Sequence, residues 1–239
     1  MRAREIDVSP ALHPVLAIVC LLWTLAAYSV VKRLHRRYGS VWLSPAIVVP
    51  ALTIALMVAF HVPYADYMAD TRWVGWLLGP ATVAFAVPIC ENWPIVRRHW
   101  LALSVGVVAG MVVGVVSAFL LARLFNFDTE VSRSLMARSV STPFAVEIVS
   151  KTGGSRDLVA LFTIATGLVG MLVGDAVLGL LRLRSSVAVG AAFGASAHGF
   201  GTARARQRDQ EEGVVASLTM VLAGVVMVLA GPSLTSLLV

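Results

Sequence analysis

The sequence has little charge. Only 13% of its 239 residues are charged and 58% are hydrophobic, whereas about a quarter of the residues in average soluble domains are charged. These proportions exclude an ordinary soluble globular protein. The apolar runs are long and short charged loops separate them, so we expect an all-α polytopic membrane protein that forms a single integral membrane domain over residues 1–239, with about seven or eight membrane segments.

Cysteine and the signatures of hydrolases are also scarce. Cys20 and Cys90 both lie in apolar runs, which argues against a disulfide framework or a zinc site. The sequence contains neither GxSxG nor HExxH, so we expect no enzymatic activity, no metal and no cofactor. The net charge of +6 comes from basic residues scattered through the loops. This scatter is typical of membrane topology and argues against nucleic-acid binding.

Six long apolar runs are present. The loop after the first run contains KRLHRR, which is the strongest positive-inside signal in the chain and predicts an N-terminus on the outer side. A second charge cluster, at 204–212, is expected to be a solvated loop from which Arg204 reaches inward. The six runs cover residues 12–31, 43–61, 74–91, 100–122, 157–181 and about 213–232.

Between the fourth and fifth runs, residues 134–154 read SLMARSVSTPFAVEIVSKTGG. Pro143 removes a backbone donor and disfavours helical geometry at Thr142, so the backbone from Ser139 to Thr142 should lack helical partners. In lipid such a break is costly unless it lines a cavity. Many secondary transporters build a substrate site from a broken helix of this kind. We therefore predict that Arg138, Ser139, Ser141, Thr142 and Pro143 bind a substrate.

Two further irregular elements are expected. The run at 74–91 contains Gly79, Pro80 and Pro88 and predicts a second broken or re-entrant helix, in which Thr82 takes the place that the hydroxyls hold in the first. The glycine-dense stretch at 190–201 weakens a helix and allows close backbone approach. Within and beside it, His198 is a candidate proton carrier and Thr202 a candidate substrate ligand. The backbone positions expected to matter are Gly79, Pro80, Gly199 and Gly201.

An internal repeat is also predicted. FAVPI at 85–89 matches FAVEI at 144–148, and GMVVG at 110–114 matches GMLVG at 170–174. We interpret residues 74–122 and 134–181 as two units, each a broken helix followed by a helix with a glycine ladder, that is, glycines that recur about one helical turn apart. Chance recurrence of short apolar strings is the alternative. An inverted repeat needs an odd number of crossings in each unit, and the loop charges do not decide the orientation.

These motifs together resemble the LrgB/CidB family of membrane proteins. The resemblance rests on LLGPATVAFAVPI at 77–89, ARSVSTPFAVEI at 137–148, TIATGLVGMLVG at 163–174 and SAHGFGTARA at 196–205. The family usually has a lysine where this chain has Arg138, a threonine at Ser141 and a proline at Asp175. Its plant relative is the plastidial glycolate/glycerate transporter. Bacterial members are described as holin- or antiholin-like effectors of murein hydrolase activity and lysis, and several move small monocarboxylates with a smaller LrgA/CidA-like partner.

Residue chemistry and resemblance lead to two functional predictions. The first is a secondary transporter or facilitator of small monocarboxylates such as glycolate, glycerate, lactate or pyruvate, in which Arg138 supplies the counter-charge and His198 or Glu147 a titratable group. The alternative is a holin/antiholin-like regulator of murein hydrolase activity and lysis that acts on membrane permeability. Expected partners are the carboxylate, the LrgA/CidA-like protein, lipid and further copies of the chain, in the plasma (inner) membrane.

Each candidate residue also has a structural interpretation. Arg138 can extend from the helix start toward the membrane interface without touching a ligand. The hydroxyls can bond to carbonyls of their own helix. His198 can be a packed histidine in a turn, and Glu91 is interpreted as an acid at the membrane surface.

Overall fold

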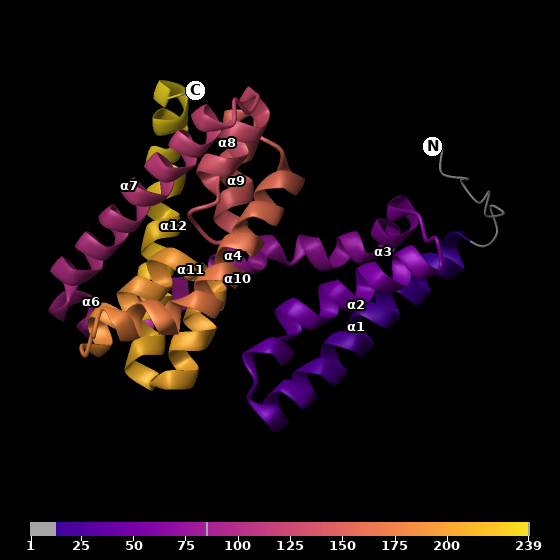
Figure 1. Cartoon of the computed structure of the whole chain (residues 1–239), viewed down its shortest axis with the longest axis horizontal. Helices are drawn as coiled ribbons and strands as arrows, with labels where there is room; N and C mark the ends of the chain where they lie inside the picture. The colour runs from indigo at the N-terminus through magenta and orange to yellow at the C-terminus, as the bar shows by residue number, and fades with distance from the viewer. Residues whose placement is uncertain (1–12, 85, 239) are drawn as a thin grey trace. The chain divides into compact units, whose positions relative to one another are not determined.

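The computed structural model describes residues 13–84 and 86–238, and the regular elements of this part are all helical. Figure 1 shows their arrangement. In chain order they are α1 (His13–Tyr38), the 3-10 turn η1 (Val41–Leu43), α2 (Pro45–Ala59), α3 (Tyr64–Trp76), α4 (Leu78–Ala84), α5 (Ala86–Glu91), α6 (Trp93–Arg98), α7 (Trp100–Leu124), α8 (Thr129–Ala137), α9 (Thr142–Thr152), α10 (Arg156–Leu180), α11 (Ser186–Arg208) and α12 (Gln210–Leu238).

The chain divides into two compact units, Met1–Leu78 and Gly79–Val239. In the first unit α1 contacts both α2 and α3. Trp23 Nε1 on α1 donates a hydrogen bond to Thr53 Oγ1 on α2 (3.3 Å), and the hydroxyls of Thr24 and Tyr67 lie 3.3 Å apart between α1 and α3. The single membrane domain expected from the sequence stays a prediction.

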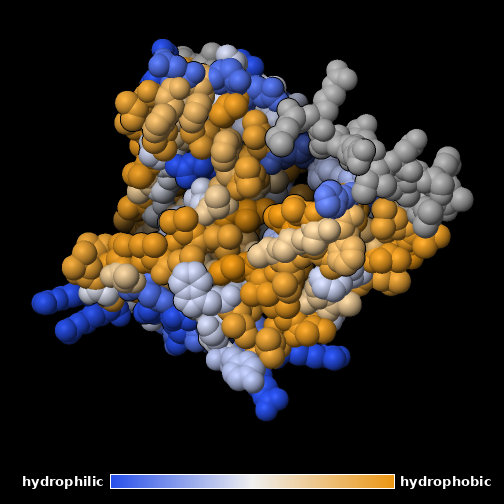
Figure 2. All heavy atoms as spheres, turned by 45° about the vertical axis from the view of Figure 1, so that its right-hand side comes forward, coloured by the Kyte–Doolittle hydropathy of each residue, from blue (hydrophilic) through white to orange (hydrophobic). Residues whose placement is uncertain are grey.

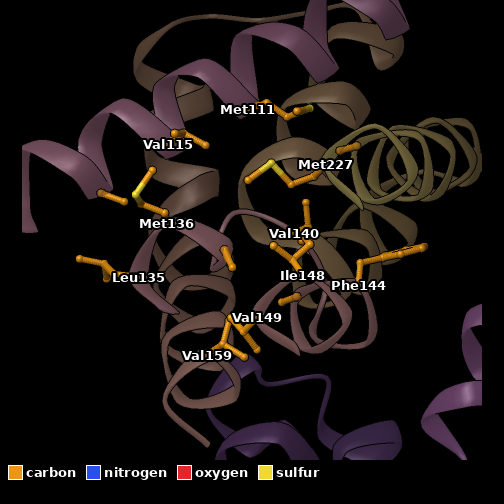
Figure 3. Packing of buried hydrophobic residues seen from close by; sticks show 14 of the residues in the cluster. Met111, Val115, Leu135, Met136, Val140, Phe144, Ile148, Val149, Val159 and Met227 are labelled. Carbon is orange, nitrogen blue, oxygen red and sulfur yellow. The ribbon is translucent and has the colours of Figure 1, made fainter. Parts of the chain in front are cut away.

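The second unit is built around α12, which contacts α5, α7, α8, α9 and α11. Apolar side chains from α7, α8, α9, α10 and α12 form one buried cluster (Figure 3). Met111 on α7, Met136 on α8, Ile148 on α9 and Met227 on α12 are representative, and none of them is more than 7% exposed. This cluster fixes the helices on both sides of the break predicted at 138–142.

Glycines set the contact between α7 and α11. A Cβ atom on Gly106 would lie 3.3 Å from the Cβ of Ala191, and one on Gly110 would lie 2.8 Å from the Cβ of Ala195. The first contact would be tight and the second closer than real Cβ atoms come, so the small residues bring the two backbones together. Because residue numbers rise together along the pair, α7 and α11 run in the same direction.

The second glycine ladder packs on the same helix from another side. A Cβ on Gly170 would lie 2.6 Å from the Cβ of Ala197, and one on Gly174 would lie 2.5 Å from Cε1 of Phe193. Here the residue numbers rise on α10 as they fall on α11, so these two helices are antiparallel. It follows that the two glycine-ladder helices, α7 and α10, run in opposite directions.

Four helices in the described ranges are long and apolar enough to cross a membrane. Helix α2, at 15 residues, falls short of the ~20 that a span requires. Hydrophobic residues cover most of the face drawn in Figure 2, in agreement with a multi-pass membrane protein. The larger total of seven or eight segments is not confirmed. The four spans are Val15–Tyr38, Trp100–Leu124, Arg156–Leu180 and Gln210–Thr235.

The expected solvated loop at 204–212 is wrong, because α11 continues to Arg208 and α12 begins at Gln210. The carboxylate of Asp209 accepts hydrogen bonds from the backbone N–H groups of Glu211 (2.8 Å) and Glu212 (3.2 Å) and so caps α12 at once. The KRLHRR segment is likewise helical, as the last turns of α1.

Candidate functional site

The break predicted around Ser139 to Thr142 is present. Helix α8 ends at Ala137 and α9 begins at Thr142, with Pro143 in its first turn, where a missing backbone donor costs nothing. Ser141 is extended (φ −65°, ψ 149°), and its carbonyl accepts the first hydrogen bonds of α9 from Phe144 and Ala145, both at 3.0 Å. The four residues between the helices therefore form a short non-helical connection.

Arg138, the first residue after α8, reaches into the space between α7 and α10. Its Nη1 donates to Thr166 Oγ1 on α10 (3.0 Å), and its Nη2 donates to Ser117 Oγ on α7 (3.3 Å). Ser117 in turn donates to the carbonyl of Gly114 (3.0 Å), which leaves its oxygen free to accept from the guanidinium. Among the residues that the structure describes, no carboxylate forms an ion pair with Arg138.

His198 marks the third irregular element. Its backbone is left-handed in φ and non-helical (φ 48°, ψ −129°) inside the otherwise helical α11, so the helix is kinked there as the glycine density predicts. The side chain is 3% exposed and lies beside the backbone of Ser139. Neither ring nitrogen has a hydrogen-bond partner of good geometry in the described part, and the same holds for the Ser139 hydroxyl.

A cavity of about 1250 Å³ connects these groups. It lies between α7, α10 and α11, and the α7 residues that line it extend from Leu101 to Ser117, about 24 Å at 1.5 Å per residue. One end, at the start of α7, is lined by exposed residues that include Arg98 as well as Leu101 and Leu181, the two leucines at 59% and 62%. The other end is polar and is formed by Ser117, Arg138, Ser139, Thr166 and His198.

Several of the predicted ligands do not line this cavity. Ser141 is buried, and its hydroxyl finds no partner among the described residues. Thr142 and Pro143 form the first turn of α9. The Thr202 hydroxyl points to α12, where it lies 3.8 Å from Met220 Sδ.

The remaining candidates lie elsewhere. Glu147 is half-exposed and pairs with Lys151 on the next turn of α9 at 2.9 Å. Thr82 belongs to α4, but its side chain lies outside the described residues. Pro80 is also in α4, and a Cβ on Gly79 or Gly199 would meet nothing within 4 Å. At Gly201, by contrast, a Cβ would lie 2.4 Å from the carbonyl oxygen of Phe193. Glu91, expected at the membrane surface, is exposed at the end of α5.

Sequence reasoning missed Ser117 and Thr166, the two hydroxyls that hold Arg138. A signal for them does exist. Ser117 continues the ladder of Gly110 and Gly114 at helical spacing, and Thr166 precedes Gly170 by one turn, so both lie on faces that pack closely against α11.

In the described part of the chain, no group of three or more His, Cys, Asp or Glu side chains is placed to hold a metal ion.

Apolar spanning helices and a cavity whose polar end lies at two helix breaks define a multi-pass integral membrane protein. Comparison with known proteins gives the family: the model of the LrgB-like family matches residues 24–237, and the chain belongs to that family. The family resemblance seen in the motifs is thereby confirmed.

Two relatives illustrate the similarity. The uncharacterized protein YxaC of Bacillus subtilis is 33% identical over 217 residues, covering 91% of this chain and 94% of its own. The holin-like protein CidB of Staphylococcus aureus is 30% identical over 210 residues, covering 88% of this chain and 92% of its own. No solved structure matches the chain.

Proposed function

We propose that this protein carries small monocarboxylates of the glycolate, glycerate, lactate or pyruvate type across the plasma (inner) membrane, through the cavity between α7, α10 and α11. The proposal rests on the position and the partners of the Arg138 guanidinium. This group lies at the polar end of the cavity and is held by two neutral hydroxyls, with no carboxylate partner in the described residues. Arg138 is partly buried, and a cation withdrawn from water is costly without a counter-charge, which an acid substrate would provide.

The surrounding groups fit a short hydroxy or keto acid. The Ser139 hydroxyl and both ring nitrogens of His198 are buried and without partners of good geometry in the described part, so each can bond to a substrate hydroxyl, a carbonyl or a water. His198 is the titratable group at this end of the cavity, and proton-coupled transport would need such a group. The cavity is larger than the roughly 300–1,000 Å³ of drug-sized ligand sites, so a small acid would share it with water.

The proposal includes an inverted internal repeat of 74–122 and 134–181. The opposite directions of α7 and α10 support it, since each carries the glycine ladder of one unit. In addition, α12 contacts both α5, which contains AVPI at 86–89, and α9, which contains FAVEI. We also propose an LrgA/CidA-like membrane protein, lipid and further copies of this chain as partners.

Uptake into proteoliposomes tests the carrier. The purified chain is reconstituted with an internal buffer, and a panel of radiolabelled hydroxy and keto acids is added outside, with acetamide as an uncharged control of similar size. We expect saturable uptake of at least one acid and none of acetamide. Absence of saturable uptake across the panel would remove the carrier proposal.

The second candidate is a holin/antiholin-like regulator of murein hydrolase activity and cell lysis, which acts by changing membrane permeability. The Staphylococcus aureus relative is named a holin-like protein, which favours this function over transport of any particular acid. The two functions differ in a leak assay with the same proteoliposomes. A permeability-forming protein releases an uncharged dye such as a small dextran conjugate together with the acids, whereas a carrier retains the dye while it moves acid.

A further inference from the structure

A second pocket lies at the corner where α10 ends and α11 begins, with a volume of about 390 Å³. Arginines come to it from both sides: Arg182 and Arg184 from the connection between the helices, and Arg208 from the last turn of α11. We call this the arginine pocket. Asp175, on the last turns of α10, is its acidic residue.

The charges of the arginine pocket do not balance. Asp175 already has two partners, since its Oδ2 accepts from Arg204 Nε at 2.6 Å and its Oδ1 from Arg208 Nη1 at 2.7 Å. Arg208 also pairs with Glu212 at 2.9 Å. Arg182 and Arg184 form no ion pair within residues 13–84 and 86–238. The pocket therefore keeps an excess of positive charge that an anion would neutralise.

One of these arginines closes the end of α10 with its backbone. Arg182 has a left-handed φ of 51°, and the N–H groups of Arg182 and Leu183 bond to the carbonyls of Gly179 and Leu178, which closes the end of α10. Glycine is the usual residue at such a position because it lacks a Cβ. With arginine there, the closing turn places a cation directly at the helix end.

Apolar side chains adjoin the arginines. The candidate span Arg156–Leu180 ends immediately before them, and Leu180 and Leu181 are 82% and 62% exposed. An exposed apolar helix end next to unpaired cations matches an amphiphile, with acyl chains along the leucines and a negative group among the arginines. Basic pockets at the ends of membrane helices bind acidic lipid head groups in this way.

We propose that the arginine pocket binds the phosphodiester head group of an anionic phospholipid. The phosphate contacts Arg182 and Arg184, while Asp175 and Arg208, paired with each other, form the floor. A free phosphate ion offers the same oxygens but gains nothing from the exposed leucines, and this difference makes the lipid the favoured source.

Native mass spectrometry of the full-length protein tests the proposal, with phosphatidylglycerol titrated against phosphatidylcholine. The Arg182→Gln/Arg184→Gln variant should bind phosphatidylglycerol about 30-fold more weakly, the loss expected for two surface charges at about 1 kcal/mol each. The matched control is Arg36→Gln/Arg37→Gln, which removes two charges from the end of α1 and should stay within about threefold of wild type. If the double variant does not fold, Arg184→Gln alone, which leaves the left-handed residue intact, should lose about fivefold.

Two results would overturn the proposal. One is equal affinity of the arginine-pocket variant and the wild type for phosphatidylglycerol. The other is full displacement of the lipid by inorganic phosphate at millimolar concentration, which would assign the pocket to a soluble anion.

Discussion

At the scale of single residues, Arg138 differs from Arg204 and Arg208 in the groups that hold its guanidinium. Arg204 and Arg208 have carboxylate partners, whereas the guanidinium of Arg138 bonds to two hydroxyls on different helices. Those two hydrogen bonds fix the plane of the guanidinium group between α7 and α10. A guanidinium fixed in this way can offer a carboxylate two parallel N–H groups, which a lysine ammonium cannot.

The first prediction concerns this cation. Arg138→Ala should weaken binding of the transported acid by about 30-fold to several thousand-fold, because truncating one partner of a partly dry ion pair costs roughly 2–5 kcal/mol. Arg138→Lys should retain part of the affinity, since it keeps the charge without the fork. Isothermal titration of purified, monodisperse protein measures both. Arg156→Ala, at an exposed arginine outside the cavity, is the control, and an unchanged affinity in Arg138→Ala would remove this residue from the site.

A second prediction tests whether Ser117 and Thr166 act by positioning Arg138 or by contacting the acid themselves. Ser117→Ala and Thr166→Val each remove one acceptor from Arg138, and each should weaken acid binding by about tenfold, since a hydrogen bond to a charged group is worth roughly 1.5 kcal/mol. Thr163→Val is a matched control on α10, because the Thr163 hydroxyl is buried without a partner in the described part. It should leave affinity unchanged. Combining Ser117→Ala with Arg138→Ala should add nothing further, and an additive loss would show that Ser117 acts independently of Arg138.

At the scale of elements, the break between α8 and α9 is held against the glycine ladder of α7. A Cβ on Gly114 would lie 2.6 Å from the Cβ of Ser139 and 2.2 Å from its hydroxyl oxygen. The connection therefore fits against α7 only because residue 114 has no side chain. Close packing of this kind couples the shape of the cavity to a single helix face.

The third prediction follows from that contact. Gly114→Ala should destabilise the protein by about 1–3 kcal/mol, the usual cost of overpacking, because Ser139 belongs to a connection that cannot move without displacing Arg138. Gly179→Ala is the control, since a Cβ there meets nothing within 4 Å and alanine favours a helix by up to about 1 kcal/mol. Thermal unfolding in detergent, followed by tryptophan fluorescence, compares the two. Equal melting temperatures for both variants would contradict the close contact.

Both irregular elements of the site could be predicted because their causes are local. Pro143 lacks a backbone donor and disfavours helical geometry at the residue before it, and the glycines around His198 weaken a helix regardless of its neighbours. The partners of Arg138 could not be predicted, because which hydroxyl meets the guanidinium depends on how α7 and α10 pack. The loop expected around Arg204 was wrong for a related reason, since the partners that keep this segment helical include Asp175, 29 residues away.

At the scale of the whole molecule, the number of helices that cross the membrane is harder to predict from the sequence than the positions where helices break. Runs such as 43–61 and 74–91 are apolar enough to suggest spans, yet the structure gives a 15-residue α2 in one and short helices α4 and α5 in the other. Hydropathy measures composition and does not detect where a helix ends. The directions of α7 and α10 come instead from their contacts with α11.

The last prediction tests these directions in a membrane. Each of the two helices has 25 residues and is about 37 Å long, enough to cross a hydrocarbon core of about 30 Å. If they cross in opposite directions, the start of α7 and the end of α10 lie on one side and the start of α10 on the other. In a Cys20→Ser/Cys90→Ser background, an impermeant maleimide should then label Arg98→Cys and Arg182→Cys from the same side and Arg156→Cys only from the opposite side. Labelling of all three from one side would rule out opposite crossings, and with them the inverted repeat.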